Sequence, residues 1–342
     1  MGQPLYGSYC PPKTSLTSQT NVPNCSGVLE ELGRKWKYWA NILIGDCPPK
    51  TIQSWKEKVF SHYQEPHRHY HTLSHLQEMF MHADESTMDL HQAGAIAMAI
   101  FFHDVIYDPN SSTNEEDSAK LFMDFANCTN FPRALAHCVR GHILATATHI
   151  SGGSDGGGSH QEDEGQEGVP GDNNARALFM DLDLAVLGRP TAAYLDGYAA
   201  AVRREHAGVP WAAYCARRAA LLRGLLLRRG AAAGAEEGGS GWLFRSRAMR
   251  EKLEEKARSN LQIEIDMLSC FINPSSAVLA ILSKPVVVWE SNNKKVPVLD
   301  KNNGHRQNDR DNTYLVLLLQ SYRRIWCSAI MWHYIFNHNF YD

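Results

Sequence analysis

Residues 93–104 read AGAIAMAIFFHD, an almost wholly apolar run that ends on a His-Asp pair. Alanine and methionine favour helix over strand, and a helix that is apolar on all sides has to be buried. Burying an imidazole and a carboxylate behind such a run costs free energy unless the two groups pair or bind a cation. His103 and Asp104 therefore mark either a metal site or the surface cap of a helix that ends before the turn at Asp108-Pro109.

Helical periodicity extends on both sides of this run. Upstream, Leu32, Trp36 and Trp39 recur at the spacing of one helix face. Further helices are predicted, in chain order, at 51–63, 73–82, 114–127, 132–147, 192–227 with a break near Pro210, and 245–268. No alternating strand pattern precedes residue 270. The sequence therefore predicts an all-α fold.

Several stretches interrupt the helical pattern. Residues 1–27 are rich in Pro, Ser, Thr and Asn and are predicted to form a disordered arm. Residues 151–174, with six acids and no Lys or Arg, and the Gly- and Ala-rich residues 231–241 are predicted to be flexible loops. These loops lie within one helical domain over 28–268. Residues 269–342 change character and form an unassigned tail.

Composition limits the classes of function. The chain has 342 residues, of which 44% are hydrophobic, and a formal net charge of -3, so it has no basic field that would attract nucleic acid or an anionic membrane. The opening residues lack a secretory pattern, and no apolar run reaches the length of a membrane span. The eight cysteines form no CxxC pair, which is typical of reduced thiols. We therefore expect a cytoplasmic protein whose partner is a small molecule.

A pair of histidines precedes the apolar run. In the stretch RHYHTLSH at 68–75, His71 and His75 are four residues apart, so they share one face if the segment is helical. Two imidazoles on one face are half of a metal site. The alternative is a solvated histidine cluster at the start of a helix.

Two acids alternate in the apolar stretch LFMDLDLAVLG at 178–188. Positions two apart on a helix do not share a face, so at most one of Asp181 and Asp183 points into the core, and the other caps a helix or is solvated. Together, the histidines, the His-Asp pair and a late aspartate supply nitrogen and oxygen ligands for one divalent ion. Such ligands suit Mn, Fe, Co, Ni or Zn better than Ca, and a bound ion of this kind polarises a phosphoryl oxygen and lowers the pKa of water.

The order His…His-Asp…Asp resembles that of the HD superfamily of metal-dependent phosphohydrolases, and more narrowly its predicted metal-dependent HD phosphohydrolase group. The similar stretches are EPHRHYHTLSHLQEM, FFHDVIYDP followed by NEEDSA, ILATATH, LFMDLDLAVLG, YAAAVRREHAGVP and LEEKARSNLQIEI. They cover roughly residues 33–268, apart from the two low-complexity loops, and the tail has no counterpart. The resemblance implies an HD-domain helical bundle that hydrolyses a small phosphate ester or nucleotide with a divalent ion (Mn, Fe, Co, Ni, Zn or Mg).

The resemblance also implies a set of metal ligands. Four residues match them: His75, His103, Asp104 and Asp183. Within the motifs, His75 fits better than His71, because it begins a helical turn that ends on an apolar residue. Asp183 fits better than Asp181, because an apolar residue precedes it and the helix continues. Asp104 is also the implied catalytic residue, because a carboxylate there can orient water as well as ligate.

Five further residues in or beside these motifs are candidates for contacting the substrate or supporting the ligands: Arg68, His71, Glu115, His149 and Asp181. Several of them have a purely structural alternative. Arg68 can pair with a surface acid, Glu115 can serve a helix N-terminus, and His149 can cap the helix before the acidic loop.

Two other classes of function compete with the enzyme. One is a catalytically silent HD module that binds a metal or a nucleotide, and the other is a non-enzymatic interaction protein on a damaged scaffold. The intact His-His-Asp-Asp set argues against the damaged scaffold, because a protein freed from metal binding has little physical reason to keep all four groups. The acidic loop at 151–174 interrupts the domain, but closing a long loop costs little free energy.

Overall fold

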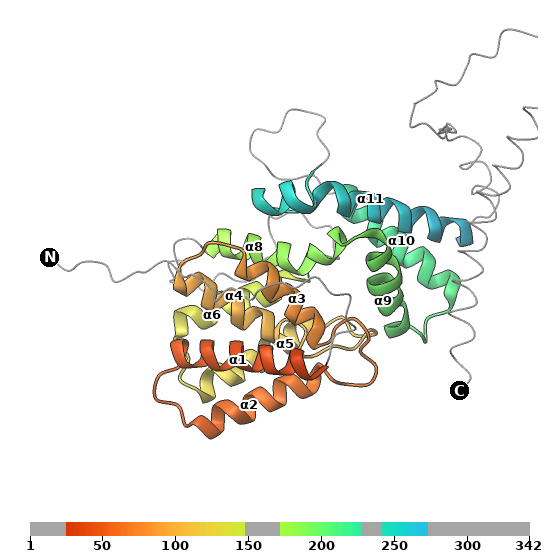
Figure 1. Ribbon diagram of the computed structural model, residues 1–342. Helices are drawn as coiled ribbons and strands as arrows, with labels where there is room; N and C mark the ends of the chain where they lie inside the picture. Colours follow the sequence, from red (N-terminus) through yellow and green to blue (C-terminus); the bar gives the residue numbers. More distant parts are fainter. Residues whose placement is uncertain (1–24, 148–171, 228–240, 273–342) are drawn as a thin grey trace, which may run out of the picture. The chain divides into compact units, whose positions relative to one another are not determined.

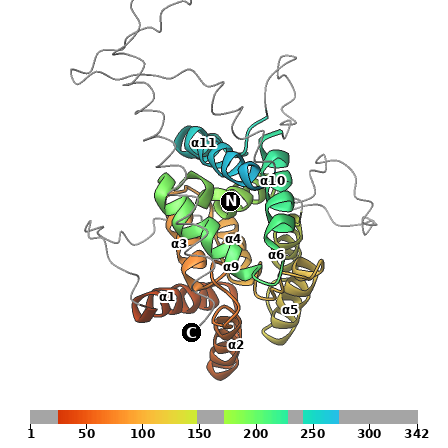
Figure 2. The same ribbon diagram turned by 90° about the vertical axis from the view of Figure 1, so that its right-hand side faces the viewer.

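The computed structural model of the chain describes residues 25–147, 172–227 and 241–272 (Figures 1 and 2). Within these ranges every regular element is a helix and none is a strand, which confirms the predicted all-α class. None of these helices is long and apolar enough to cross a membrane. The chain divides into two compact units, 1–268 and 269–342. Most of the predicted arm, loops and tail, together with His149, lie outside the described residues.

In the described residues up to Leu184, the helices are α1 (Cys25–Leu43), α2 (Pro49–His62), α3 (Leu73–Asp84), α4 (Leu90–Phe102), α5 (Asn114–Cys128), α6 (Arg133–Ala145) and α8 (Asp172–Leu184). A 3₁₀ turn η1 (Ala185–Gly188) and a π-helical segment η2 (Ala193–Ala199) follow, and then α9 (Ala200–Glu205), α10 (Trp211–Leu227) and α11 (Arg247–Ile272). The predicted break near Pro210 falls between α9 and α10.

Two predicted boundaries are wrong. Helix α1 begins at Cys25, inside the predicted arm at 1–27, and the burial of Val28 in the core explains why this end is held as helix. Helix α8 begins at Asp172, inside the predicted loop at 151–174. Polar residues in the first turn of α8 resemble loop sequence, because the free amide groups of a helix start favour polar and acidic side chains.

Helix α4 lies at the centre of the domain (Figures 1 and 2), and every one of its residues from Ala93 to Phe102 is buried. It packs against α1, α3, α5, α6 and α8. An aromatic cluster covers its C-terminal half, where the buried Trp36 ring lies 5.1 Å from Phe101 and 5.6 Å from Phe125 between centroids. His103 is the C-cap residue of α4, so the most buried helix of the domain fixes the position of the His-Asp pair.

A close approach at Gly188 gives a first prediction. A Cβ atom at Gly188 would lie 2.8 Å from both Cβ and Cδ2 of Leu253, a buried residue of α11. We expect Gly188→Ala to lower the free energy of unfolding by about 1–3 kcal/mol, because the core has to shift to admit the methyl group. Gly141 in α6 has open space around its Cα, so Gly141→Ala is a matched control and should raise stability by about 0.5–1 kcal/mol. Urea unfolding of both variants measures the difference, and equal changes would contradict the packing argument.

Candidate metal centre

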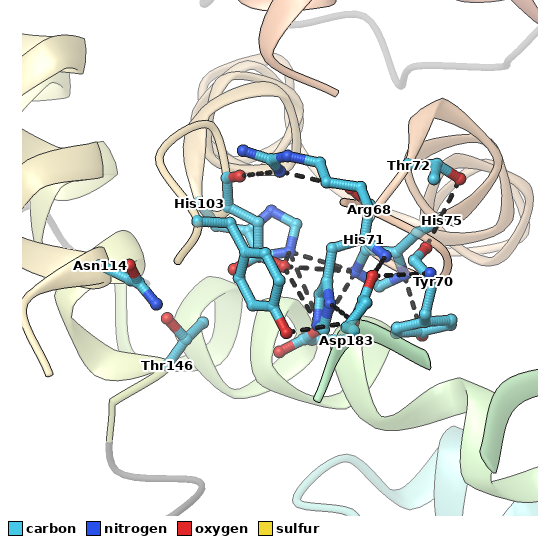
Figure 3. Close-up of polar contacts among 12 residues, drawn as sticks. Arg68, Tyr70, His71, Thr72, His75, His103, Asn114, Thr146 and Asp183 are labelled. Atoms are coloured by element: carbon cyan, nitrogen blue, oxygen red, sulfur yellow. Dashed lines mark hydrogen bonds and ion pairs between the residues drawn. The ribbon is translucent and has the colours of Figure 1, made fainter. Parts of the chain in front are cut away.

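Three side chains from different parts of the sequence form a compact group. They are His75 on α3, His103 directly after α4, and Asp183 on α8, and Figure 3 shows them with their polar groups turned toward one another. Nε2 of His75 lies 3.2 Å from Nε2 of His103 and 3.3 Å from Oδ1 of Asp183, and His103 Nε2 lies 3.7 Å from the same oxygen. Metal–ligand bonds of about 2.1 Å place neighbouring ligand atoms roughly 3–3.5 Å apart. The group therefore has the spacing of ligands around one ion.

Asp104 adjoins this group as a fourth oxygen donor. Its Oδ2 lies 3.1 Å from Nε2 of His103 and 3.9 Å from Nε2 of His75. The two imidazoles are fully enclosed, whereas 18% of the Asp104 side chain and 19% of the Asp183 side chain are exposed. The carboxylates are therefore the solvent-exposed part of the group.

The hydrogen bonds of the two buried rings leave their Nε2 atoms as ligand atoms. Nδ1 of His103 donates to the carbonyl oxygen of Ile100 at 3.1 Å, because a carbonyl can only accept. Nδ1 of His75 lies 3.0 Å from the hydroxyl of Tyr70, which can accept in the same way. When a ring is neutral, its lone pair is therefore on Nε2, and the two Nε2 atoms face each other beside two carboxylates. This is how proteins orient histidines that bind metals.

The charges in the group favour a cation between the ligands. Burial alone would lower the pKa of His103, but Asp104 and then Asp183 raise it to about 9. Burial would raise the pKa of Asp104, but the neighbouring His103 holds it below its usual range. The carboxylates therefore stabilise an added proton on His103. A divalent ion between the ligand atoms can take the place of that proton.

Arg68 is buried beside the group and hydrogen-bonds to the backbone. Its Nη1 donates to the carbonyl oxygen of Asp104 at 2.6 Å, its Nη2 donates to that of Val105 at 2.9 Å, and its Nε donates to Glu65. The guanidinium thus fixes the segment that carries Asp104. Of the roles predicted for Arg68, the structure shows support of a ligand-bearing segment and an ion pair with the partly exposed Glu65, and contact with a substrate stays a prediction.

Asp181 is fully buried and serves a helix end instead of the metal group. Its Oδ1 accepts from the backbone N–H of Arg245 at 2.7 Å, and its Oδ2 accepts from that of Ser246 at 2.6 Å. Both amides lie directly before α11, where free N–H groups need acceptors. The structure therefore gives Asp181 the role of a cap for α11, and Asp183, not Asp181, belongs to the compact group.

Among the described residues, Glu115 is not part of the compact group either. Glu115 is half-buried in the first turn of α5, and burial, followed by the charges of Asp104, Glu116 and Asp183, raises the pKa of its carboxyl despite an opposing backbone hydrogen bond. Its carboxyl is therefore within electrostatic reach of the group. His149 lies outside the described residues.

One acid that the sequence did not single out is buried beside the group. Glu205, the last residue of α9, accepts the backbone N–H groups of residues 69–71 and the Nδ1–H of His71. Burial would raise the pKa of Glu205, but His71 and the backbone donors lower it to about 2. Burial would lower the pKa of His71, but Glu205 raises it above its usual value. Glu205 lies 134 residues from His71, so no local spacing pattern could link the two.

Comparisons with known proteins find no match for this chain among protein-family models, curated proteins or solved structures. The resemblance to HD phosphohydrolases therefore stays an expectation from the sequence motifs. What the site can do has to be inferred from its own side chains and their geometry.

Proposed function

We propose that this chain is a metal-dependent phosphohydrolase of the HD type that acts on a small phosphate ester or nucleotide. The observation that carries the proposal is the compact group of His75, His103 and Asp183, whose ligand atoms all lie within 4.8 Å of one another. Asp104 adds a second carboxylate 3.1 Å from His103 Nε2. The order of these residues along the chain is also the order of the motif that the sequence resembles.

The residues fit a divalent cation. Two enclosed imidazoles have their Nδ1 atoms engaged and their Nε2 atoms facing each other, and two carboxylates complete the donor set. Mixed nitrogen and oxygen donors suit Mn, Fe, Co, Ni or Zn, and the carboxylates also allow Mg. When bound, such an ion polarises a phosphoryl oxygen and makes water nucleophilic at neutral pH.

The chain itself supplies the positioning. Asp104 is held through its backbone, because Arg68 donates to its carbonyl oxygen and its own N–H donates to the Tyr63 hydroxyl at 3.3 Å. A carboxylate fixed in this way and partly open to solvent can accept a hydrogen bond from a water molecule and orient it toward phosphorus. Asp183 exposes a similar fraction of its side chain, so both carboxylates border the space that a substrate enters.

The test measures metal content and turnover on the full-length protein. We expect the purified chain to contain a divalent ion close to equimolar with protein, and to hydrolyse at least one phosphate ester. The panel comprises nucleotides, sugar phosphates and p-nitrophenyl phosphate, each with Mn, Co, Ni, Mg and Zn. Bound metal without turnover for any pairing would favour the catalytically silent module. Absence of bound metal, both as purified and after incubation with each ion, would reject the metal centre.

A further inference from the structure

The carboxylate of Glu205 divides its hydrogen bonds between its two oxygens. Oε1 accepts the backbone N–H groups of His69, Tyr70 and His71 at 2.8, 2.7 and 2.9 Å. Oε2 accepts Nδ1–H of His71 at 2.7 Å and the hydroxyl of Tyr107 at 3.1 Å. One oxygen therefore holds the chain before α3, and the other holds side chains. The Glu205 side chain has no exposed surface, and five donors offset the cost of burying its charge.

The Oε2 contact decides how the ring of His71 is turned. Because a carboxylate oxygen only accepts, Nδ1 of His71 carries the proton and is committed to Glu205. The other ring nitrogen, Nε2, then points to the metal group and lies 3.9 Å from Oδ2 of Asp104. The ring packs against Tyr107 at 4.2 Å between centroids, which limits its rotation. Figure 3 shows His71 beside His75 and Asp183.

This arrangement separates His71 from the ligands. The centroids of the His71 and His75 rings are 6.0 Å apart, and the compact group of ligand atoms comprises His75 but not His71. Nε2 of His71 therefore lies at the edge of the group, on the side of the partly exposed Asp104. A nitrogen in this place is positioned to meet an oxygen of a phosphate bound beside the ion.

We propose that Glu205 is a positioning residue of the site, which acts through Oε2 by fixing the tautomer and orientation of His71 so that Nε2 accepts a hydrogen bond from a protonated phosphate oxygen of the substrate. The inference rests on the proposed function and adds to it a residue that contacts the substrate and a residue that positions it. A buried carboxylate that accepts from Nδ1 is an established way to hold an imidazole in one tautomer and one orientation.

The division of hydrogen bonds between the two oxygens gives a selective variant. In Glu205→Gln, the amide oxygen can replace Oε1 and keep the three backbone bonds. The amide NH₂ then replaces Oε2 and cannot accept from His71. Tyr107→Phe is the matched control, because it removes the other bond to Oε2 and leaves the His71 bond in place. His71→Ala and the double variant with Glu205→Gln complete a mutant cycle.

The expected result is a loss of turnover without a loss of metal. We expect Glu205→Gln to keep the metal content and melting temperature near those of the wild type, and to lower kcat by about 10- to 100-fold, the range for residues that orient groups at a metal site. In the His71→Ala background, Glu205→Gln should have no further effect. Unchanged kcat in Glu205→Gln, or additive losses in the double variant, would overturn the proposal.

A spectroscopic measurement makes the inference independent of turnover. In ¹⁵N-labelled protein, the wild type and Tyr107→Phe should show the proton of His71 on Nδ1, and Glu205→Gln should not. Inorganic phosphate added to the metal-loaded wild type should shift the signals of the His71 ring. A wild-type spectrum with the proton on Nε2 alone would reject the inference without any variant, even if Glu205→Gln fails to fold. A wild type that binds metal and phosphate but turns over no substrate would reject the hydrolase while leaving the positioning role intact.

Discussion

Replacing His103 with alanine, or Asp183 with asparagine, is expected to weaken metal binding by more than about 100-fold, because loss of a ligand exceeds the 10- to 100-fold loss seen for outer-shell partners. His103 contributes a nitrogen 3.2 Å from His75 Nε2, and Asp183 contributes an oxygen 3.3 Å from the same atom. Each substitution therefore removes one of the three ligand atoms of the compact group. Turnover should fall at least about 1000-fold, since a metal at a phosphoryl centre contributes several kcal/mol to the barrier.

Two matched control variants show whether an effect is specific to the candidate site or follows from the loss of any histidine or aspartate. His67 is half-exposed and bonds to the backbone of Tyr107, and Asp196 is exposed on η2. We expect His67→Gln and Asp196→Asn to keep the metal and the activity of the wild type.

Metal analysis and thermal unfolding with and without added ion provide the two measurements. A bound ion stabilises the folded state by mass action, so the wild type and both controls should melt at higher temperature with metal, and His103→Ala and Asp183→Asn should not. Equal metal occupancy in all of these proteins would remove His103 and Asp183 from the ligand set.

The local features of the fold were predictable from the sequence. The run from Ala93 to Phe102 forms a buried helix, as predicted. Its Ala- and Met-rich composition favours helix, and a helix that is apolar on all sides has to be buried. Both the helical structure and the burial therefore follow from this stretch alone. Of the two interpretations of His103, the helix end is confirmed, although the residue is buried and not at the surface, and the metal site stays a prediction. His103 is the C-cap residue of α4, and its ring is enclosed next to His75.

The sequence did not indicate which distant backbone groups the polar side chains around the site bind. Asp181 caps amides 64 and 65 residues downstream, and Arg68 binds carbonyl oxygens 36 and 37 residues downstream. Almost every residue has the same backbone donor and acceptor, so the sequence does not indicate which backbone group a side chain will bind. Glu205 was missed for the same reason, because three of its five partners are amide groups.

The π-helical segment η2 was also not predicted, and it brings tyrosines to the neighbourhood of the site. Tyr198 packs against Tyr70 at 4.6 Å between ring centroids, and Tyr70 bonds to His75. On its other side, Tyr198 lies 5.1 Å from the guanidinium of Arg218. Ring contacts thus link His75 to a buried ion pair between α10 and α11.

The second large effect is expected at this ion pair. Arg218 Nε lies 2.9 Å from Oε1 of Glu264, and their side chains are only 8% and 4% exposed. The hydroxyl of Tyr194 also donates to Glu264. Arg218→Met keeps much of the side-chain volume but leaves the Glu264 carboxylate buried without its cation. We expect the free energy of unfolding to fall by about 3–5 kcal/mol, the cost of leaving one partner of a buried pair uncompensated.

A second substitution shows whether the uncompensated charge causes this loss. Glu264→Gln in the Arg218→Met background removes the charge and keeps an oxygen that can accept from Tyr194, so the double variant should recover most of the lost stability. Arg247 forms an exposed pair with Glu251 on α11, where the side chains are 85% and 64% exposed, and Arg247→Ala should leave stability unchanged. Urea unfolding followed by circular dichroism compares the variants. If Arg218→Met unfolds like Arg247→Ala, or if the double variant is less stable than Arg218→Met alone, then packing rather than charge holds α10 and α11 together at this point.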